Sequence, residues 1–294
     1  GRIGQRIGGA KIAAFDQPEE ITQFLRRKTY IVKDRSTVAA EPATRRFPLA
    51  LSRKRAEFET VVAPVDTNQL IEEVERLPPE ARLVEHGPYL VFVSRAAAIP
   101  STLRELGRLR EITFRQIGEG TGRSIDLDEF DEHYLHLFVW NNETCEIVGA
   151  YRMGLTDEIL GDCGKRGLYT NTLFRLKDEF LEELNPAIEL GRSFVRVEYQ
   201  KKHASLSLLW KGIGSFVALH PRYARLFGPV SITAEYSSIS KDLMVQFLRE
   251  NRLHPTLSKL VKARKPHLAN RLRALMNESL RDGARDIDDV SALI

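Results

Sequence analysis

The chain has 294 residues, of which 43% are hydrophobic and 29% charged, and its formal net charge is +4. This composition is typical of a globular protein with one sizeable core or two small ones. No stretch approaches the roughly 18 apolar residues of a membrane span, and no signal peptide follows Gly1. Two cysteines are too few for a zinc site or a disulfide framework, so we expect a reducing, cytoplasmic compartment.

Charge is distributed unevenly along the chain. Residues 1–60 hold 13 Lys/Arg against 7 Asp/Glu, and residues 251–282 hold 8 against 2, whereas residues 61–250 hold 22 against 28. Basic ends suit anionic lipid headgroups, an acidic carrier protein or nucleic acid, although solvated surface charge explains them equally well. Nucleic acid is the weakest of these partners, because the basic residues are not interleaved with aromatic ones and the centre is acidic.

The predicted elements divide the chain into four parts. Residues 1–35 contain a helical segment, PEEITQFLRRKTYIV, that is too short to be a domain. Residues 36–79 combine a polar linker or arm with a helix, TNQLIEEVERLPPEAR, that ends at a proline pair. Residues 80–255 carry the main alternation of strands and helices, and residues 256–294 read as a basic extension that stops abruptly. The absence of an initiator Met suggests a piece of a longer protein.

The main region opens with a strand pair and a long helix. RLVEHGPYLVFVS predicts a hairpin or a bent strand around Gly87-Pro88. PSTLRELGRLREITFRQIGEG follows and predicts a helix, with Leu103, Leu106 and Leu109 on one stripe, Pro100 near its start and the glycines from Gly118 past its end. YLHLFVW and EIVGAYRMG then predict an antiparallel hairpin that turns at Asn141-Asn142.

The remaining segments complete a mixed α/β sheet flanked by helices. AIELGRSFVRVEY predicts a strand, and a helix follows with apolar residues at helical spacing. PVSITAEY predicts a further strand, and Ser237 or Ser238 caps a last helix in SSISKDLMVQFLREN. The crossover from Glu189 to Thr233 should join parallel strands.

Charged residues interrupt these apolar strands. Glu189 and Arg192 lie in one strand and Arg152 in another, where an unpaired charge would cost several kcal/mol. Alternation places Glu189 and Arg192 on opposite faces unless a bulge intervenes, and Gly191 favours such a bulge. A bulge would free backbone N–H groups that polarise a thioester carbonyl, while a nearby carboxylate takes a proton from an amine. A structural salt-bridge network is the alternative interpretation.

Several motifs in consistent order resemble a known family. LREITF, DLDEFDEHYLHLFVW, IVGAYRMG, LYTNTLF, ELGRSFVRVEYQ and LLWKGIG are similar to the acyl carrier protein-dependent N-acyltransferases of the GNAT superfamily, which include the haemolysin-like ornithine- and glycine-lipid synthases. The similarity covers about residues 80–255 and implies a GNAT-like mixed sheet. A weaker resemblance, through an Arg/Phe helix, a D-x-x-D pair, an arginine strand and an E-x-x-R strand, is to the acyl-homoserine-lactone synthases.

The resemblance implies roles for individual residues. Glu189 would be the general base or would hold a water that serves as one. Phe114 would pack on the substrate or the acyl chain. The amino-acid pocket would be shaped by five charged residues: Arg110, Asp128, Asp131, Arg152 and Arg192. Taken alone, Arg110 reads as an exposed helical arginine; its interpretation as a pocket residue depends on partners that occur in register.

The acyl donor is implied by the segment after the Glu189 strand. Relatives that bind coenzyme A place a glycine-rich loop there, whereas this chain has QKKHAS without a glycine. This departure favours a phosphopantetheine arm on an acidic carrier protein, with coenzyme A as the alternative donor and no bound cofactor. The donor side would comprise Val195, Lys201, Lys202 and His203. Solvent exposure is the alternative reading of the two lysines.

Three further patterns carry less information. GRIGQRI and ITQFLRRKTYIV resemble the tail of glycerolipid O-acyltransferase domains, which implies a fused parent protein, although the catalytic His and Asp of those domains do not occur here. GEGTG follows a helix rather than a strand, so it indicates a mobile loop. His133 and His136 lack a third ligand and are expected to pack or to form hydrogen bonds, so we predict no metal.

The sequence therefore predicts an enzyme that moves a fatty acyl group, with 3-hydroxy acyl groups included, from acyl carrier protein to the α-amine of a small amino acid such as ornithine or glycine. Aminolipid synthesis at an anionic inner-membrane face is the expected setting, with the protein peripheral to the membrane. One rival is an acyl-homoserine-lactone-type synthase, which needs S-adenosylmethionine. The other is a non-catalytic module that binds membrane surfaces.

Overall fold

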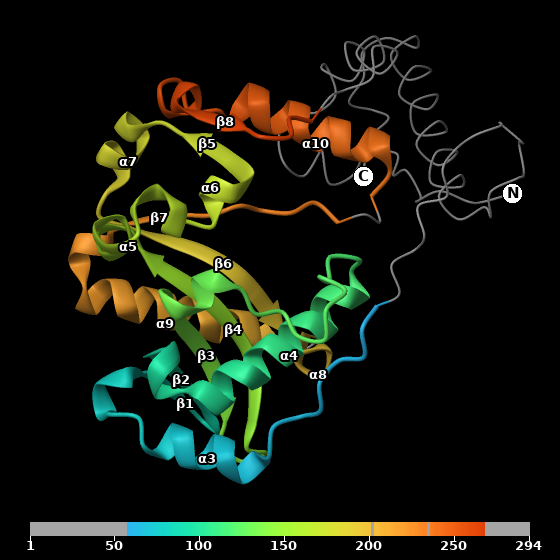
Figure 1. Cartoon of the computed structure of the whole chain (residues 1–294), viewed down its shortest axis with the longest axis vertical. Helices are drawn as coiled ribbons and strands as arrows, with labels where there is room; N and C mark the ends of the chain where they lie inside the picture. The colour runs from blue at the N-terminus through green and yellow to red at the C-terminus, as the bar shows by residue number, and fades with distance from the viewer. Residues whose placement is uncertain (1–57, 201–202, 234–235, 268–294) are drawn as a thin grey trace, which may run out of the picture. The chain divides into compact units, whose positions relative to one another are not determined.

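The computed structural model describes residues 58–200, 203–233 and 236–267 (Figure 1). They belong to two compact units. The described part of the larger unit is residues 58–200, 203–231 and 259–265, and that of the smaller is residues 232–233, 236–258 and 266–267. The predicted helical segment in residues 1–35, most of the linker and the end of the basic extension lie outside the described residues.

A mixed six-stranded sheet forms the framework of the larger unit, which confirms the predicted fold class. Every neighbouring pair is antiparallel except the pair that joins residues 187–189 to residues 225–227, which is parallel. The predicted parallel crossover therefore forms, but it ends before Thr233, the end that the sequence predicts. In spatial order the strands are β1 (Arg82–His86), β2 (Tyr89–Arg95), β3 (Leu135–Asn141), β4 (Glu146–Leu155), β6 (Ala187–Val195) and β7 (Arg225–Phe227).

Both hairpins form where the turn chemistry predicts them. Gly87 adopts a φ of +56° between β1 and β2, a backbone conformation that favours glycine. The second turn joins β3 to β4, and there Asn141 Oδ1 accepts a hydrogen bond from the N–H of Glu143 at 3.1 Å. All seven residues of β3 are buried, so this central strand is covered on both faces.

Helices cover both faces of the sheet. Leu208, Leu209 and Ile213 of α9 (His203–Leu219) pack into one apolar cluster with strand residues, including Leu137. Leu106 and Leu109 of α4 (Pro100–Gln116) and residues of α3 (Thr67–Glu75) pack into a second cluster with residues such as Phe138. Helical spacing of apolar residues therefore predicts α4 and α9 correctly.

The start of α4 is fixed by a buried carboxylate. Pro100 occupies the first turn of the helix, where its missing N–H costs nothing. Glu73 of α3 accepts hydrogen bonds from the backbone N–H groups of Ser101 and Thr102, both at 2.7 Å. A negative charge at a helix N-terminus is stabilising, so this contact holds α3 against α4.

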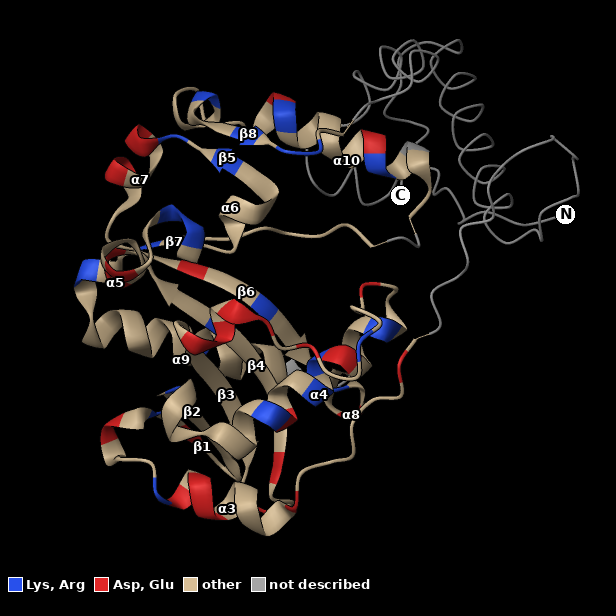
Figure 2. Cartoon of the chain, in the orientation of Figure 1, with Lys and Arg blue, Asp and Glu red and all other residues tan. Residues whose placement is uncertain are grey.

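Short elements fill the chain between β4 and β6, where the sequence predicts none. They are α5 (Thr156–Asp162), α6 (Thr170–Leu173), β5 (Phe174–Leu176) and α7 (Asp178–Leu184). β5 pairs with β8 (Val261–Ala263) in a separate two-stranded sheet. Figure 2 shows acidic residues on α7 and basic residues on β5 and β8. Single 3-10 turns lie at η1 (Pro79–Ala81), η2 (Ala96–Ala98), η3 (Glu129–Glu132), η4 (Gly164–Gly167), η5 (Pro221–Tyr223) and η6 (Leu257–Leu260).

Two predicted strands differ from the structure. PVSITAEY forms no strand in its described residues, and β7 lies just before it, where it pairs with β6 over three residues. AIELGRSFVRVEY begins as β6 but leaves the sheet after Val195, and α8 (Val197–Gln200) follows. Pattern alone did not place these ends, because pairing with neighbouring strands decides where a short strand stops.

The described part of the smaller unit contains α10 (Ser238–Asn251). Ser237 caps it, since its hydroxyl accepts a hydrogen bond from the N–H of Ser240 at 3.0 Å, as predicted. Asp242 contacts His267 at 2.5 Å. In the described residues, no helix has both the length and the apolarity needed to cross a membrane.

Candidate active site

The sheet opens along β6, next to Glu189. β7 pairs with β6 only over Ala187–Glu189, whereas β4 pairs with β6 along its length. The register of β6 against β4 shifts where Gly191 and Phe194 face Arg152 and Ala150, so β6 bulges between those two residues. The predicted bulge is therefore present, and from Leu190 onwards no strand in the described residues pairs with the β7 side of β6.

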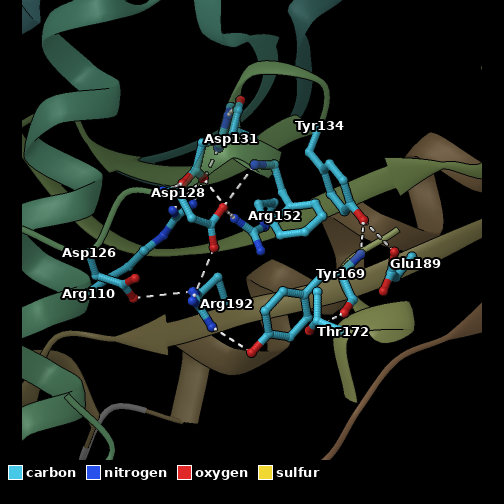
Figure 3. Close-up of polar contacts among 12 residues, drawn as sticks. Arg110, Asp126, Asp128, Asp131, Tyr134, Arg152, Tyr169, Thr172, Glu189 and Arg192 are labelled. Atoms are coloured by element: carbon cyan, nitrogen blue, oxygen red, sulfur yellow. Dashed lines mark hydrogen bonds and ion pairs between the residues drawn. The ribbon is translucent and has the colours of Figure 1, made fainter. Parts of the chain in front are cut away.

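The bulge turns Arg192 toward the other charged residues. Arg192 has a φ of +47°, the left-handed conformation that side chains other than glycine rarely adopt. Its guanidinium contacts Asp128 at 3.1 Å, and Arg152 binds the other oxygen of the same carboxylate (Figure 3). Strict alternation would point Arg192 to the opposite face from Glu189, so the bulge is what brings it to this site.

Six charged residues alternate in sign across the site. We name this set the charge chain: Arg110, Asp131, Arg152, Asp128, Arg192 and Asp126, in order of contact. The first link, Arg110 to Asp131, measures 2.6 Å, and the next, Asp131 to Arg152, measures 3.3 Å. The last, Arg192 to Asp126, measures 3.3 Å. Because each member faces an opposite charge, burial of the set is tolerated.

A capping box holds the two central aspartates in place. Asp128 accepts a hydrogen bond from the N–H of Phe130 at 3.1 Å, and Asp131 accepts one from the N–H of Asp128 at 2.9 Å. These reciprocal bonds fix the short helix η3 directly before β3. The D-x-x-D spacing thus orients both carboxylates toward Arg152.

Burial and neighbouring charges act in opposite directions on the first pair of the charge chain. Arg110 is fully buried on α4, so the exposed reading of this arginine is wrong. Burial lowers its pKa, Asp131 opposes this shift, and the nearby Arg152 adds to it. Burial alone would raise the pKa of Asp131, but Arg110 and Arg152 outweigh it and hold this pKa at about 2. Asp131 is therefore charged at neutral pH.

Asp126 lies at the far end of the charge chain. Its carboxylate is 2% exposed, and burial raises its pKa even though Arg192 and Arg110 oppose the shift. Asp126 is the first residue of the family-like motif DLDEFDEHYLHLFVW, but nothing in that motif distinguished it from the other acidic residues there.

His136 lies beneath the charge chain as a neutral hydrogen-bonding residue, as predicted. Its Nε2 donates to the carbonyl of Asp131 at 2.9 Å, which leaves Nδ1 to accept from Arg110 at 3.4 Å. Burial first, and then the charge of Arg110, lower its pKa from 6.5 to about 4. His133 is exposed.

This shift predicts acid sensitivity. Between pH 6.5 and 4 the unfolded chain binds a proton at His136 and the folded protein does not, so the free energy of unfolding falls as the pH falls. We expect a loss of about 3 kcal/mol from His136 over this window. Urea unfolding at several pH values, with an NMR titration of the imidazole, measures it. The raised pKa of Asp126 has the opposite effect, because it increases the free energy of unfolding as the pH falls. The NMR titration of His136 therefore decides, and a His136 pKa above 6 would contradict the prediction.

Arg152 has free hydrogen-bond donors inside an aromatic cage. The rings of Phe130, Tyr134 and Tyr169 lie 5.1–5.7 Å from its guanidinium carbon. Nη1 binds the two aspartates, whereas Nε and Nη2 have no hydrogen-bond partner among the described residues, although the side chain is fully buried. These two nitrogens form the side of the guanidinium that binds a carboxylate through two parallel hydrogen bonds.

Glu189 is buried and fully hydrogen-bonded. One carboxylate oxygen accepts from the hydroxyl of Tyr134, and the other accepts from the N–H of Thr170 at 2.5 Å and from its hydroxyl. Tyr134 in turn accepts from the N–H of Tyr169 at 2.9 Å. Burial, followed by the charge of Glu189, raises the pKa of Tyr134 above its ordinary value of 10, so the phenol keeps the proton that it donates to Glu189. Glu189 thus joins β6 to the segment that precedes β3 and to the start of α6.

The structure brings together most of the predicted site residues. The five predicted pocket residues all belong to the charge chain, and Glu189 lies next to it. Phe114 is half-buried and packs against the apolar cluster that α3 and α4 form with the sheet. Val195 is the last residue of β6. Lys201 and Lys202 lie outside the described residues, and His203 begins α9. Sequence reasoning assigned no role to Asp126, Tyr134, Tyr169 and Thr170, although the family-like motifs DLDEFDEHYLHLFVW and LYTNTLF contain them.

Comparison with known proteins agrees with this geometry. The family described as acetyltransferase (GNAT) domain matches residues 109–211, a stretch that contains the whole charge chain and Glu189. A glycine N(alpha)-acyltransferase of Bacteroides thetaiotaomicron is 37% identical over 205 residues, covering 66% of this chain and 60% of that protein. One of Phocaeicola vulgatus is 35% identical over 220 residues, 71% of this chain and 67% of that protein.

The chain thus spans three-fifths to two-thirds of the length of these two relatives. The similarity to these relatives extends beyond the residues that the family description matches. The mixed sheet, the open β6 and the buried charges all agree with the assignment that this similarity gives. This chain belongs to the N-acyltransferases of the GNAT superfamily.

Proposed function

We propose that this protein transfers a fatty acyl group from an acyl thioester to the α-amine of glycine or a similarly small amino acid. The observation that carries the proposal is the juxtaposition of the opened, bulged β6 with the free donors of Arg152. The first is suited to an acyl thioester, and the second to the carboxylate of an amino acid. The name of the glycine N(alpha)-acyltransferase relatives supports glycine as the acyl acceptor.

Arg152 binds the acceptor carboxylate in this proposal. Its free Nε and Nη2 offer two parallel N–H groups, and the aromatic cage keeps water away from the resulting ion pair. Glycine fits better than ornithine, because a second ammonium would need an acidic partner. Asp126, Asp128 and Asp131 each already face an arginine.

The proposed chemistry is direct attack by the amine. Its nitrogen forms a bond to the thioester carbonyl carbon, the carbon–sulfur bond breaks, and the thiolate leaves. Backbone N–H groups at the bulge stabilise the oxyanion. Glu189 receives the amine proton through the hydroxyl of Tyr134 or Thr170, because these groups occupy its carboxylate oxygens.

The donor in this proposal is a phosphopantetheine thioester on an acidic acyl carrier protein, with coenzyme A as the alternative. GNAT acyltransferases use acyl thioesters as co-substrates and hold no cofactor of their own. QKKHAS after α8 lacks the glycines that would wrap a pyrophosphate, which supports the carrier protein.

The product would be an N-acyl amino acid, an amphiphile that enters aminolipid synthesis at the cytoplasmic membrane face. We retain the predicted fusion as part of the proposal: residues 1–35 end an O-acyltransferase-like domain, residues 36–79 link it to the N-acyltransferase domain at 80–255, and residues 256–294 form a basic extension. An O-acyl group added by the fused domain would complete the lipid.

An acceptor series tests this function. Purified protein is given a long-chain acyl carrier protein or acyl-coenzyme A, with glycine, ornithine or glycinamide, and the products are identified by mass spectrometry. We expect N-acylglycine, and a KM for glycinamide about 10- to 100-fold higher, because the amide cannot form the charged pair with Arg152.

Three results would contradict the proposal. No N-acyl product from any acceptor would overturn acyl transfer. Equal use of glycinamide and glycine would overturn the role of Arg152. A product that forms only when S-adenosylmethionine is added would indicate homoserine-lactone synthesis instead.

A further inference from the structure

A small two-stranded sheet presents four basic side chains on one face. We call this surface the basic ribbon and define it by Arg175 and Lys177 on and after β5, and Lys262 and Arg264 on and after β8. Its position is marked by the basic residues at β5 and β8 in Figure 2. All four residues are exposed and belong to the larger unit.

Strand register places the four cations together. Arg175 lies directly opposite Lys262. The ladder continues beyond both strands, because the N–H of Lys177 donates to Leu260 at 3.0 Å and the N–H of Arg264 donates to Leu173 at 2.9 Å. Alternation along each strand therefore puts all four side chains on the same face. Phe174, Leu176 and Val261 pack inward, in an apolar cluster.

Nothing in the described residues neutralises this face. None of the four forms an ion pair with a described carboxylate, and Asp178, which follows Lys177, is paired with Lys165. Like charges directly opposite each other destabilise a sheet, so the pair Arg175–Lys262 has an energetic cost within the fold itself. An anionic partner on this face would relieve that cost.

The basic ribbon adjoins the candidate active site through α6. Arg264 donates from Nε to the carbonyl of Asn171 at 3.0 Å. The preceding residue, Thr170, binds Glu189 through its N–H and its hydroxyl. One four-residue helix thus connects the ribbon to the carboxylate on β6, so a partner seated on the ribbon would lie close to the opened strand.

We propose that the basic ribbon is the docking surface for an acidic acyl carrier protein that delivers the thioester to β6. The proposal rests on the donor assigned under the proposed function. A carrier protein fits better than an anionic membrane, because α7 begins directly after Lys177 with Asp178 and Glu179 and continues with Glu182 and Glu183. A planar anionic surface would meet this acidic helix as well, whereas a small partner can bind the ribbon alone.

Charge variants test the docking surface. Lys262→Glu places a carboxylate opposite Arg175, so an ion pair replaces a repulsion and the variant should unfold at the wild-type temperature or above. We expect it to bind a long-chain acyl carrier protein about tenfold more weakly, and Arg175→Glu/Lys262→Glu more weakly still. The matched control is Arg82→Glu/Arg104→Glu, which changes the charge equally at exposed residues of β1 and α4.

Binding is measured by calorimetry at two salt concentrations, and transfer to glycine is measured with acyl carrier protein and with acyl-pantetheine. We expect kcat/KM to fall with carrier protein and to stay unchanged with acyl-pantetheine. Wild-type carrier binding in both ribbon variants would overturn the docking surface. So would ribbon variants that lose only binding to phosphatidylglycerol vesicles, which would assign the ribbon to the membrane. If the wild-type protein transfers from neither donor, the proposed function fails, and the binding measurement still decides the docking surface.

Discussion

Replacing Glu189 by glutamine should lower kcat by about 10²- to 10⁴-fold while the protein stays folded. Glutamine keeps an oxygen that can accept both hydrogen bonds from Thr170, so the start of α6 remains attached to β6. The glutamine amide cannot take up the amine proton through the hydroxyl of Tyr134 or Thr170. Single-turnover acylation of glycine, with circular dichroism to confirm the fold, measures the effect.

The companion variants separate proton transfer from positioning. Tyr134→Phe and Thr170→Val remove the two hydroxyls that contact Glu189, and the one that carries the proton should reproduce much of the loss in kcat. Glu146→Gln, on β4 and paired with Arg196 outside the site, is the matched control and should retain activity. If Glu189→Gln turns over at the wild-type rate, the carboxylate serves only to hold Thr170.

Replacing Asp131 by asparagine should lower the free energy of unfolding by about 3–5 kcal/mol. The change removes the carboxylate that lies between Arg110 and Arg152, and both of these guanidinium groups are fully buried. Arg110 would then be buried without an ion-pair partner among the described residues, and Arg152 would keep only Asp128. Urea denaturation at pH 7, where the pKa of about 2 keeps the wild-type carboxylate charged, measures the loss.

An exposed pair provides the comparison. Glu72→Gln breaks the ion pair with Arg76 on α3, where both side chains are more than half exposed, and it should change stability by about 1 kcal/mol or less. Combining Asp131→Leu with Arg110→Met should recover part of the stability lost in Asp131→Asn, because it removes a buried charge along with its partner. A loss below about 1 kcal/mol for Asp131→Asn would show that water reaches the site.

Local patterns predict the parts of the fold whose contacts are local. The stripe of α4, the hairpins β1–β2 and β3–β4 and the cap of α10 each depend on residues a few positions apart. Residues 156–186 escaped prediction because their elements are short and depend on distant partners, as in the pairing of β5 with β8. The wrong strand at PVSITAEY has the same origin, since its β-branched residues fit a strand that the sheet does not use there.

The candidate site also contains features that the sequence predicts and residues that it does not. The conflict between Glu189 and Arg192 in one apolar strand predicts the bulge that the structure contains. Tyr134 and Thr170 carry no such signal, because their hydroxyls matter only once the fold brings them to a carboxylate 55 and 19 residues away in sequence. The acceptor, the donor and the domain boundaries stay predictions.

The alternating order of the charge chain makes its members interdependent in evolution and in engineering. Each of the four inner residues has opposite charges on both sides, so altering one deprives two neighbours of an ion-pair partner. Effects of double substitutions within the set will therefore not add, and viable sequence drift should pass through linked pairs rather than single steps. Redesign of the acceptor pocket would begin at Asp126, the terminal member, whose loss leaves only one arginine to accommodate.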